Sequence, residues 1–288
     1  MIDEKYRRIA LIGMGKNVGK TTVLNYLIKS FAAQNKSLAL TSIGRDGEDV
    51  DVVTKTTKPR IFAPSGSIVA TAEGLLSLCD ISLEVLNVTD YYTPMGRVCI
   101  VRALTQGFVQ LGGPSIAAQM ASLLDGLPFD IDKILIDGAI SRKSLAAPHI
   151  ADAAILCTGA AISSDINEVI AQTRFIANIY LLPQAMPKDG DIVLQGAVTD
   201  NIIQPLLNTP DLKNKRVVAE DAGKIFISRP MYEKLQIRRV GLAVLKPIVL
   251  AAITVNPTSP RGYSFAAQEF LERMREAVPI PVYDVKRM

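Results

Sequence analysis

Short apolar runs alternate with helical patterns along most of the chain, and this alternation sets the predicted fold. Apolar runs of four to eight residues predict buried strands, and apolar residues that recur every three or four positions predict helices. The predicted strands are residues 9–12, 37–43, 132–139, 150–160, 196–199, 216–219, 224–227 and 249–255. The predicted helices are residues 23–31, 115–126, 165–177, 201–207 and 231–235. Strands that alternate with helices in this way predict an α/β fold with a mainly parallel, doubly wound sheet.

The pattern changes between residues 57 and 111, where shorter strands dominate. The turn at 64–67 predicts one β-hairpin, and residues 97–103 and 107–111 predict a second pair of strands. Residues 73–88, between them, are predicted to be helical. We therefore expect a single domain over residues 1–288 that carries a β-rich insertion, and the pattern leaves the pairing of these strands open.

Composition narrows the class of protein without identifying it. The chain has 288 residues, of which 49% are hydrophobic and 21% charged, as in soluble globular proteins that bury a sizeable core. Its net charge of +4 is small and evenly spread, so no nucleic-acid partner is expected. Charges at residues 3–5 and the lack of a long apolar run argue against a signal peptide or membrane span, so a cytoplasmic location is expected.

Cysteine and histidine chemistry gives no further site. Cys79, Cys99 and Cys157 lack the C-x-x-C spacing of zinc sites and are expected to be reduced core residues. His149 is the only histidine, and we interpret it as structural. A Ser/His/Asp or Cys/His catalytic arrangement would depend on it, so this hydrolase chemistry is disfavoured.

The strongest motif runs from Arg8 to Thr22, where an apolar run breaks into glycines and then into Gly-Lys-Thr-Thr. A glycine-rich turn between a strand and a helix points backbone N–H groups at one anion, and the helix dipole adds to the attraction. In the phosphate-loop interpretation, Lys20 contacts the β- and γ-phosphates, and Thr21 gives its hydroxyl to Mg²⁺. The predicted nucleotide-binding residues of this motif are Gly15, Lys16, Asn17, Val18, Gly19, Lys20, Thr21 and Thr22.

The match to the phosphate-loop pattern has one defect. Counted back from Gly19, Met14 stands where the first glycine belongs, and Gly13 and Gly15 flank it. We expect one of these two glycines to supply the flexibility at a shifted position. A glycine-containing turn that merely precedes a helix is the alternative.

A second motif lies in the strand at 132–139, where Asp137 ends an apolar run. This is the Walker B pattern, in which an acid at the end of a buried strand lies beside Mg²⁺. The following residues, 138–143, are the expected second switch, with a backbone N–H or Arg142 as the sensor of the γ-phosphate. An ordinary acid at a strand end is the alternative for Asp137.

Acidic residues also follow the strand at 37–43. Loops at the carboxyl ends of parallel strands line the ligand crevice, so Asp46, Glu48 or Asp49 could meet the metal or the attacking water. A solvent-facing acidic turn is the alternative.

These motifs resemble the SIMIBI class of P-loop NTPases, which includes dimerising ATPases, dethiobiotin synthetase and metallocofactor chaperones. Lys16 in K-N-V-G-K-T-T looks like the extra lysine of that class, although it lies one place later than in the dimerising ATPases. The resemblance makes Asp46 the preferred first-switch acid and metal ligand beside Thr21 and Asp137. It also implies that Asn256, which ends a late strand before a proline loop, holds the base. No Asn-Lys-x-Asp guanine motif is present, so ATP is favoured over GTP.

A narrower resemblance covers most of the chain. The segments G-M-G-K-N-V-G-K-T-T, T-S-I-G-R-D-G-E-D-V-D, T-P-M-G-R-V-C-I-V-R-A-L, Q-L-G-G-P-S and T-V-N-P-T-S-P resemble a bacterial family that accompanies cobalamin- and pyridoxal-phosphate-dependent lysine and ornithine aminomutases. The resemblance implies an ATP-driven reactivating factor that works with a second, mismatch-repair-ATPase-like subunit and releases damaged cobalamin, so that intact adenosylcobalamin can enter. A homodimer is compatible with it.

Two other functions stay open. One is a small-molecule kinase or ligase of the dethiobiotin synthetase type, although that loop normally carries a Thr-Asp pair near the position of residues 14–16. The other is a nucleotide-binding regulatory subunit without hydrolysis, with which Met14 is compatible. The expected catalytic residues are Lys20, Asp46 and Asp137.

Overall fold

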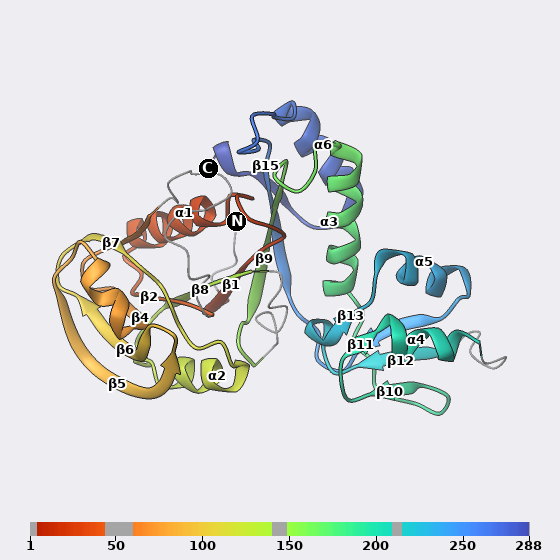
Figure 1. The fold of residues 1–288 in the computed structure, drawn as a ribbon, viewed down its shortest axis with the longest axis horizontal. Coiled ribbons are helices and arrows are strands. Elements are labelled where there is room, and N and C mark those ends of the chain that lie inside the picture. The colour runs from red at the N-terminus through yellow and green to blue at the C-terminus, as the bar shows by residue number, and fades with distance from the viewer. Residues whose placement is uncertain (1–4, 44–59, 140–148, 209–214, 288) are drawn as a thin grey trace.

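The predicted alternation of strands and helices produces one large sheet with helices on both faces (Figure 1). The computed structural model describes residues 5–43, 60–139, 149–208 and 215–287. The strands of the large sheet are β1 (Arg8–Gly13), β2 (Leu38–Ser42), β4 (Ile68–Ala72), β5 (Leu83–Thr93), β6 (Gly96–Ala103), β8 (Lys133–Ala139), β9 (Ala153–Gly159), β15 (Leu250–Asn256) and β16 (Val282–Asp284). The helices that pack on this sheet are α1 (Lys20–Ala33), α2 (Ala117–Asp125), α3 (Ile166–Tyr180) and α6 (Ala267–Ala277).

The order of the nine strands places β1 near the middle. It is β16-β15-β9-β1-β8-β2-β4-β6-β5, and the first seven strands are parallel. At one edge of the sheet, β6 pairs antiparallel with both β4 and β5. The predicted α/β class with a mainly parallel sheet is confirmed, and all seven parallel strands end at one edge.

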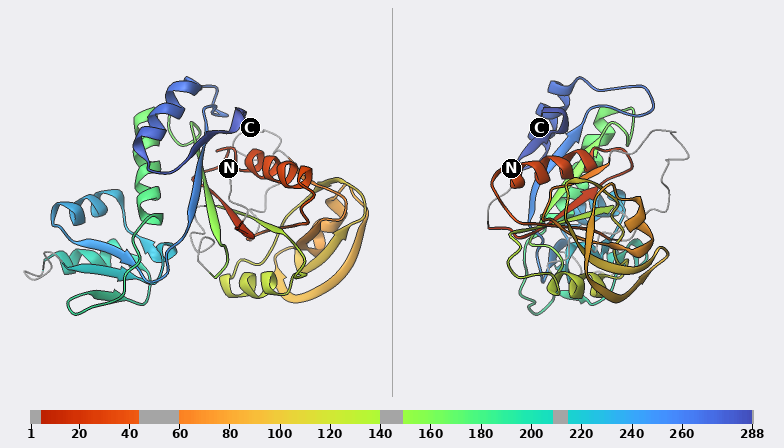
Figure 2. Two further views of the ribbon diagram at one scale, coloured as in Figure 1. Left: turned by 180° about the vertical axis from the view of Figure 1, so that it is seen from behind. Right: turned by 90° about the vertical axis from the view of Figure 1, so that its left-hand side faces the viewer.

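Helices cover the two faces of the sheet in a way that follows from side-chain alternation along β1. Leu11 packs with α1 residues such as Leu24, whereas Ile12 packs with α3 and α6 on the opposite face. Helix α2 covers that second face farther along the sheet, where Met120 packs against Ile136 of β8. Figure 2 shows this arrangement from two further sides. The sheet is therefore wound on both faces.

The β-rich region differs from its prediction in one element. The helix predicted over residues 73–88 is wrong: a short 3-10 helix, η1 (Glu73–Leu78), is followed by the long edge strand β5. Residues 83–93 contain valines, threonines and tyrosines, which favour extended backbone, and they pair with β6 around the turn at Gly96.

The hairpin predicted at the turn 64–67 is also absent among the described strands. Strand β3 (Ile61–Ala63) does not pair with β4 but with β7 (Gly107–Val109), antiparallel and outside the large sheet. Strand β4 pairs with β2 and β6 instead. The turn residues were correctly placed, but two neighbouring strands can join different partners, and local sequence does not select them. Strands β3 to β7 all lie within the segment predicted as the insertion.

A second, smaller sheet forms a lobe beside the large one, on the right in Figure 1. It contains three parallel strands in the order β10-β12-β14, and a separate parallel pair joins β11 to β13. The elements of this lobe are β10 (Ile192–Leu194), β11 (Val198–Thr199), α4 (Asp200–Leu207), β12 (Arg216–Ala219), η4 (Ala222–Lys224), β13 (Ile225–Phe226), α5 (Arg229–Ile237) and β14 (Gly241–Val244). The remaining described element is η5 (Val285–Arg287), after β16.

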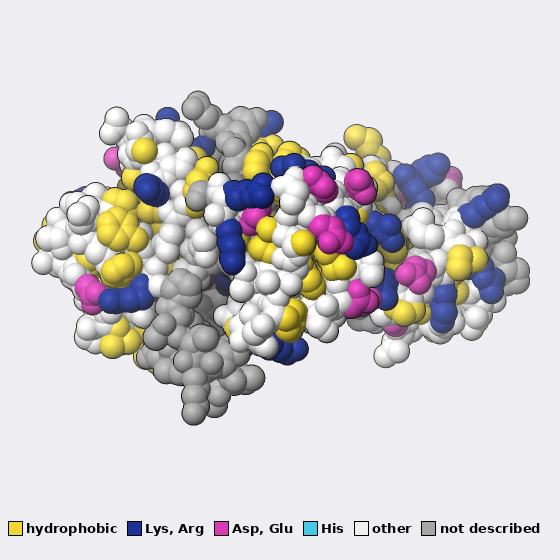
Figure 3. Space-filling view, turned by 90° about the horizontal axis from the view of Figure 1, so that it is seen from above, with side chains coloured by type: hydrophobic (Ala, Val, Ile, Leu, Met, Phe, Trp, Pro, Cys, Tyr) yellow, Lys and Arg dark blue, Asp and Glu magenta, His cyan; other side chains and the backbone are white. Residues whose placement is uncertain are grey.

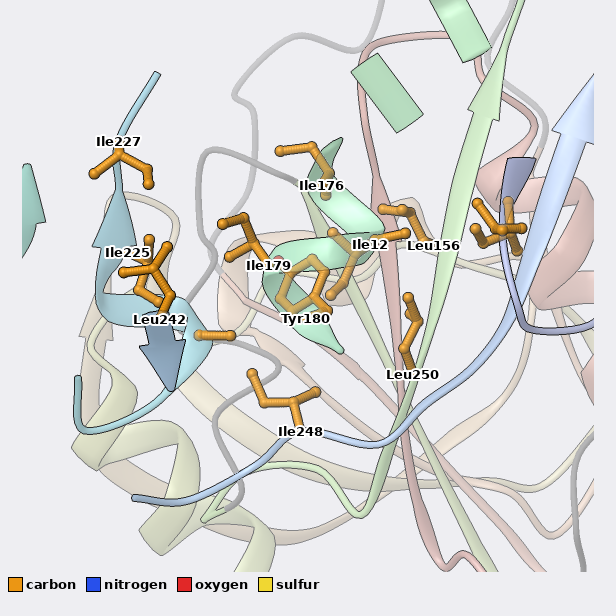
Figure 4. Close-up of a cluster of buried hydrophobic side chains, with 14 of the residues drawn as sticks. Ile12, Leu156, Ile176, Ile179, Tyr180, Ile225, Ile227, Leu242, Ile248 and Leu250 are labelled. Atoms are coloured by element: carbon orange, nitrogen blue, oxygen red, sulfur yellow. The ribbon is translucent and has the colours of Figure 1, made fainter. Parts of the chain in front are cut away.

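One hydrophobic cluster connects the lobe to the large sheet. It includes strand residues such as Leu156, helix residues of α3 and lobe residues such as Leu242. Figure 4 shows Tyr180, at the end of α3, between these two groups. Because each fully buried side chain of this size contributes about 1.5–3 kcal/mol, the cluster holds the lobe against the sheet. Sequence periodicity gave no sign of this division into two lobes.

The helices are short relative to a bilayer. Across the described ranges, none is both long and apolar enough to cross a membrane. Figure 3 shows the molecule from above, with Lys and Arg side chains interspersed with Asp and Glu over the described surface. This face therefore carries no field of a single sign.

Tyr180 gives a test of the packing between the lobes. Its hydroxyl is buried and makes no hydrogen bond to the described residues, and burial, followed by the charge of Asp221, raises the pKa of its phenol. We expect Tyr180→Phe to raise the free energy of unfolding by about 1 kcal/mol, because it removes a buried polar group without a partner. Urea unfolding measures this change.

Tyr232 is the control, because its half-buried phenol interacts with Asn178 of α3, which opposes the rise in pKa caused by burial. Tyr232→Phe should lower the free energy of unfolding by about 1 kcal/mol. A comparable loss in Tyr180→Phe would contradict the prediction and would show that the Tyr180 hydroxyl has a partner.

Candidate functional site

The loop between β1 and α1 takes its shape from two residues in the left-handed region. Asn17 has φ 60° and Gly19 has φ 88°, whereas neither Gly13 nor Gly15 has a positive φ. The left-handed conformations of the loop therefore fall on Asn17 and Gly19 and not on Gly13 or Gly15. Asparagine tolerates this conformation better than most residues, since its short side chain bonds locally.

Met14 continues the strand pairing in place of a glycine turn. Its N–H donates to the Cys157 carbonyl of β9 at 2.9 Å. Its side chain packs against the cluster that contains Ile12. The backbone of Met14 thus needs no conformation reserved for glycine.

The N-terminus of α1 presents unpaired backbone donors. Gly19 is its N-cap, no side chain caps it, and its first turn contains no acid. The Gly19 carbonyl accepts the first bond, from the Val23 N–H at 3.1 Å. The N–H groups of Lys20, Thr21 and Thr22 have no carbonyl within the helix to bond, and the dipole makes this end positive. Together with the loop, this end of α1 suits an anion such as a phosphate.

Lys20 and Asp137 lie together, as the two motifs predict. The Lys20 Nζ atom is 3.0 Å from the Asp137 Oδ1 atom and donates to the Gly138 carbonyl at 2.8 Å. Leu11 pairs with Asp137 in the sheet, so the carboxylate lies on the face covered by α1. The two side chains are 23% and 19% exposed, which leaves both groups reachable by a ligand.

This contact is an ion pair without a well-directed hydrogen bond. Asp137 Oδ1 is buried, and no hydrogen bond of good geometry reaches it from the described residues, although Lys20 lies within ion-pair distance. A carboxylate oxygen in this condition keeps its capacity to accept a further partner. Thr21 is half-buried and Thr22 is exposed, both in the first turn of α1.

Asn256 reaches the same loop from the other end of the chain. Its Nδ2 atom donates to the Asn17 carbonyl at 3.1 Å, and its Oδ1 atom accepts from the Thr258 N–H at 3.2 Å. The structure therefore brings Asn256 to the loop between β1 and α1, with its amide bonded to the protein.

Three residues at this edge were missed by the sequence analysis. A Cβ atom on Gly159 would lie 2.5 Å from the Asn256 carbonyl oxygen, so only glycine fits there. Val285 packs against Gly19, and the buried Asp284 at the end of β16 accepts from the Lys286 N–H at 2.9 Å. Gly159 was visible as a strand-ending glycine, whereas the last strand is too short to give a periodic signal.

Several predicted site residues cannot be placed. Asp46, Glu48, Asp49 and Arg142 lie outside the described residues, and so do residues 140–143 of the expected second switch. The predicted metal ligands Thr21 and Asp137 are described. Within the described ranges, no group of three or more His, Cys, Asp and Glu side chains could hold a metal by itself.

A cavity of about 460 Å³ lies elsewhere, between α2 and the loop after β12. His149, Glu220, Asp221 and Lys224 line it with three alanines of α2, and none of residues 13–22 does. We assign the site from the loop geometry, because the cavity contains none of the predicted residues.

Burial raises the pKa of Cys157, beside the loop, to about 12, so this thiol is neutral near pH 7 and a poor nucleophile.

Comparisons with models of protein families, with curated proteins and with solved structures found no match. The functional argument therefore rests on the motifs and on the geometry of this site.

Gly19→Ala tests the packing around the loop. The new methyl group would take a φ of 88° and would lie 3.2 Å from the nearest Val285 methyl carbon. We expect the free energy of unfolding to fall by more than the roughly 1–2 kcal/mol of a left-handed alanine, because this contact adds to the backbone cost. Urea unfolding measures the loss.

The control is Gly66→Ala, which has a φ of 85° and open space around the added carbon. It should lose only the backbone cost. Equal losses in the two variants would show that Val285 moves aside freely and does not constrain the loop.

Proposed function

We propose that this chain is a P-loop NTPase of the SIMIBI class that binds ATP with Mg²⁺ at the loop between β1 and α1. We further propose that it is the ATPase subunit of a reactivating factor for a cobalamin- and pyridoxal-phosphate-dependent lysine or ornithine aminomutase. A second, mismatch-repair-ATPase-like subunit and a cytoplasmic location belong to the same proposal. The resemblance described above supports the partner, and the site geometry supports the nucleotide.

The observation that carries the nucleotide proposal is the distance of 3.0 Å between Lys20 Nζ and Asp137 Oδ1. Two motifs far apart in the sequence bring the first residue of the uncapped helix α1, a lysine, beside an acid near the carboxyl end of β8. This combination favours a metal–nucleotide site over an unrelated glycine turn.

The residues at the site fit Mg²⁺ and a triphosphate. Mg²⁺ prefers oxygen ligands and keeps several waters, and the Asp137 carboxylate and the Thr21 hydroxyl are the groups that would hold it. When bound, the ion would neutralise charge on the phosphates. Lys20 would bind the β- and γ-phosphates, and the loop N–H groups would orient them. Asp46 is the proposed first-switch acid.

Movement of the switch segments on hydrolysis is the physical basis for the proposed work on a partner enzyme. The face in Figure 3 carries interspersed charges of both signs, which is compatible with a protein partner. ATP is proposed over GTP because the chain lacks the Asn-Lys-x-Asp motif. A homodimer remains compatible with the proposal.

Lys20→Ala tests nucleotide binding. We expect MgATP affinity to fall on the order of 100-fold, because charge-assisted bonds to two phosphates are lost. Isothermal titration calorimetry measures the affinity. Lys29→Ala is the control, since Lys29 is an exposed lysine two turns farther along α1. Equal affinity in Lys20→Ala and the unchanged protein would exclude the phosphate-loop assignment.

A partner assay tests the reactivating function. We expect ATP hydrolysis to rise when an aminomutase with damaged cobalamin is added, together with release of that cobalamin. Asp137→Asn should keep the fold but lose Mg²⁺-dependent ATP hydrolysis, because a neutral amide binds the ion poorly. Phosphate release and cobalamin absorbance measure the two effects.

The outcomes separate the alternatives. Binding without hydrolysis under all conditions would favour the regulatory subunit. Transfer of the γ-phosphate to a small acid would favour the kinase or ligase. A rate of ATP hydrolysis that does not change when the damaged aminomutase is added would exclude the proposed partner.

A further inference from the structure

Asn256 and Asn17 make a contact across almost the whole chain. The Asn256 Nδ2 atom, at the end of β15, donates to the Asn17 carbonyl at 3.1 Å, over a separation of 239 residues. Asn17 has a φ of 60°, which costs free energy for any residue with a side chain. A bond to its carbonyl favours the peptide orientation that this conformation produces.

Neighbouring contacts fix the Asn256 side chain and backbone in place. Its Oδ1 atom accepts from the Thr258 N–H, and its carbonyl accepts from the Ala160 N–H at 2.9 Å. Gly159 lacks the Cβ atom that would collide with the Asn256 carbonyl. Asn256 is therefore held from two sides while it bonds to the loop.

Half of the hydrogen-bonding capacity of the Asn256 amide is used within the protein. Of its two N–H donors, one bonds to Asn17, and of the two lone pairs on Oδ1, one accepts from Thr258. A base would have to compete with these contacts or use what they leave. The same bonds point the side chain's donor at the loop that would bind the phosphates.

We propose that Asn256 is a positioning residue for the phosphate loop and does not select the base. It would hold the Asn17 peptide so that the N–H groups of the following residues face the phosphates. This inference rests on the proposed binding of a nucleoside triphosphate. It predicts that Asn256 contributes equally to every ligand that presents the same triphosphate.

Three ligands separate positioning from base recognition: ATP, GTP and inorganic tripolyphosphate, each with Mg²⁺. In titration calorimetry, Asn256→Ala should weaken all three by the same factor, on the order of tenfold, because the loss is one hydrogen bond that organises the loop. The ATP-to-GTP ratio should not change. Thr258→Ala is the control, since it keeps the Thr258 N–H and does not touch Asn17.

A rescue variant separates loop positioning from a general loss of stability. In the Asn256→Ala background, Asn17→Gly should recover part of the lost affinity for all three ligands, because glycine adopts a positive φ without steric cost. Asn256→Asp should bind worse than Asn256→Ala, since a carboxylate places a lone pair against the Asn17 carbonyl and a negative charge beside the phosphates. Circular dichroism verifies that each variant is folded.

Two results would overturn the inference. One is a changed ATP-to-GTP ratio in Asn256→Ala with unchanged affinity for tripolyphosphate, which would make Asn256 a base contact. The other is the absence of any rescue by Asn17→Gly in a folded protein. If the unchanged protein bound none of the three ligands, the proposed function would fail and this inference would fall with it.

Discussion

The position of β1 between β8 and β9 is the constraint on which the site depends. Its residues 9–12 are fully buried, and both of its edges are paired with parallel strands. The chain must therefore leave β1 at the carboxyl edge and turn over the sheet to start α1. Acidic and polar residues that end the neighbouring strands meet this turn, because parallel strands end at the same edge. The strand order therefore brings these functional groups together at one edge of the sheet.

The charged groups in this cluster differ in how completely they are paired. Lys20 has both the Gly138 carbonyl and the Asp137 carboxylate as partners, whereas Asp137 Oδ1 accepts no well-directed bond from the described residues. Removing two charges partly from water costs free energy that an isolated ion pair recovers poorly. A triphosphate and a divalent cation would give each group a stronger partner. This imbalance fits a site arranged for a ligand better than it fits a structural salt bridge.

Sequence reasoning predicted the parts of the fold that are local and strongly patterned. Strand β1, helix α1 and strand β8 appear where expected, and Lys20 lies beside Asp137. The edge strand β5 was mistaken for a helix because its apolar residues also fit a helical spacing, and pairing with β6 decides its conformation. The lobe beside the sheet depends on contacts around Tyr180 that join segments far apart in sequence.

The candidate site also contains a contact that local sequence does not predict. Asn256 was placed at the right edge, but its bond to the Asn17 carbonyl was not predicted. No pattern within either segment indicates that bond, because it depends on β15 and β1 being separated by only one strand in the sheet. Asp46 and Arg142 lie outside the described residues, so their roles stay predictions.

The departure of Met14 from the phosphate-loop pattern has a physical explanation in the same contacts. A glycine is needed at a loop position when its backbone must take a positive φ or approach a ligand closely. Met14 takes no positive φ; its N–H extends the pairing with β9, and its half-buried side chain packs against the core. The conformational demand has moved to Asn17 and Gly19, which take the positive φ angles. Asn256 from one strand end and Val285 beyond another support these two positions, so the loop is shaped by the late strands of the sheet as much as by its own glycines.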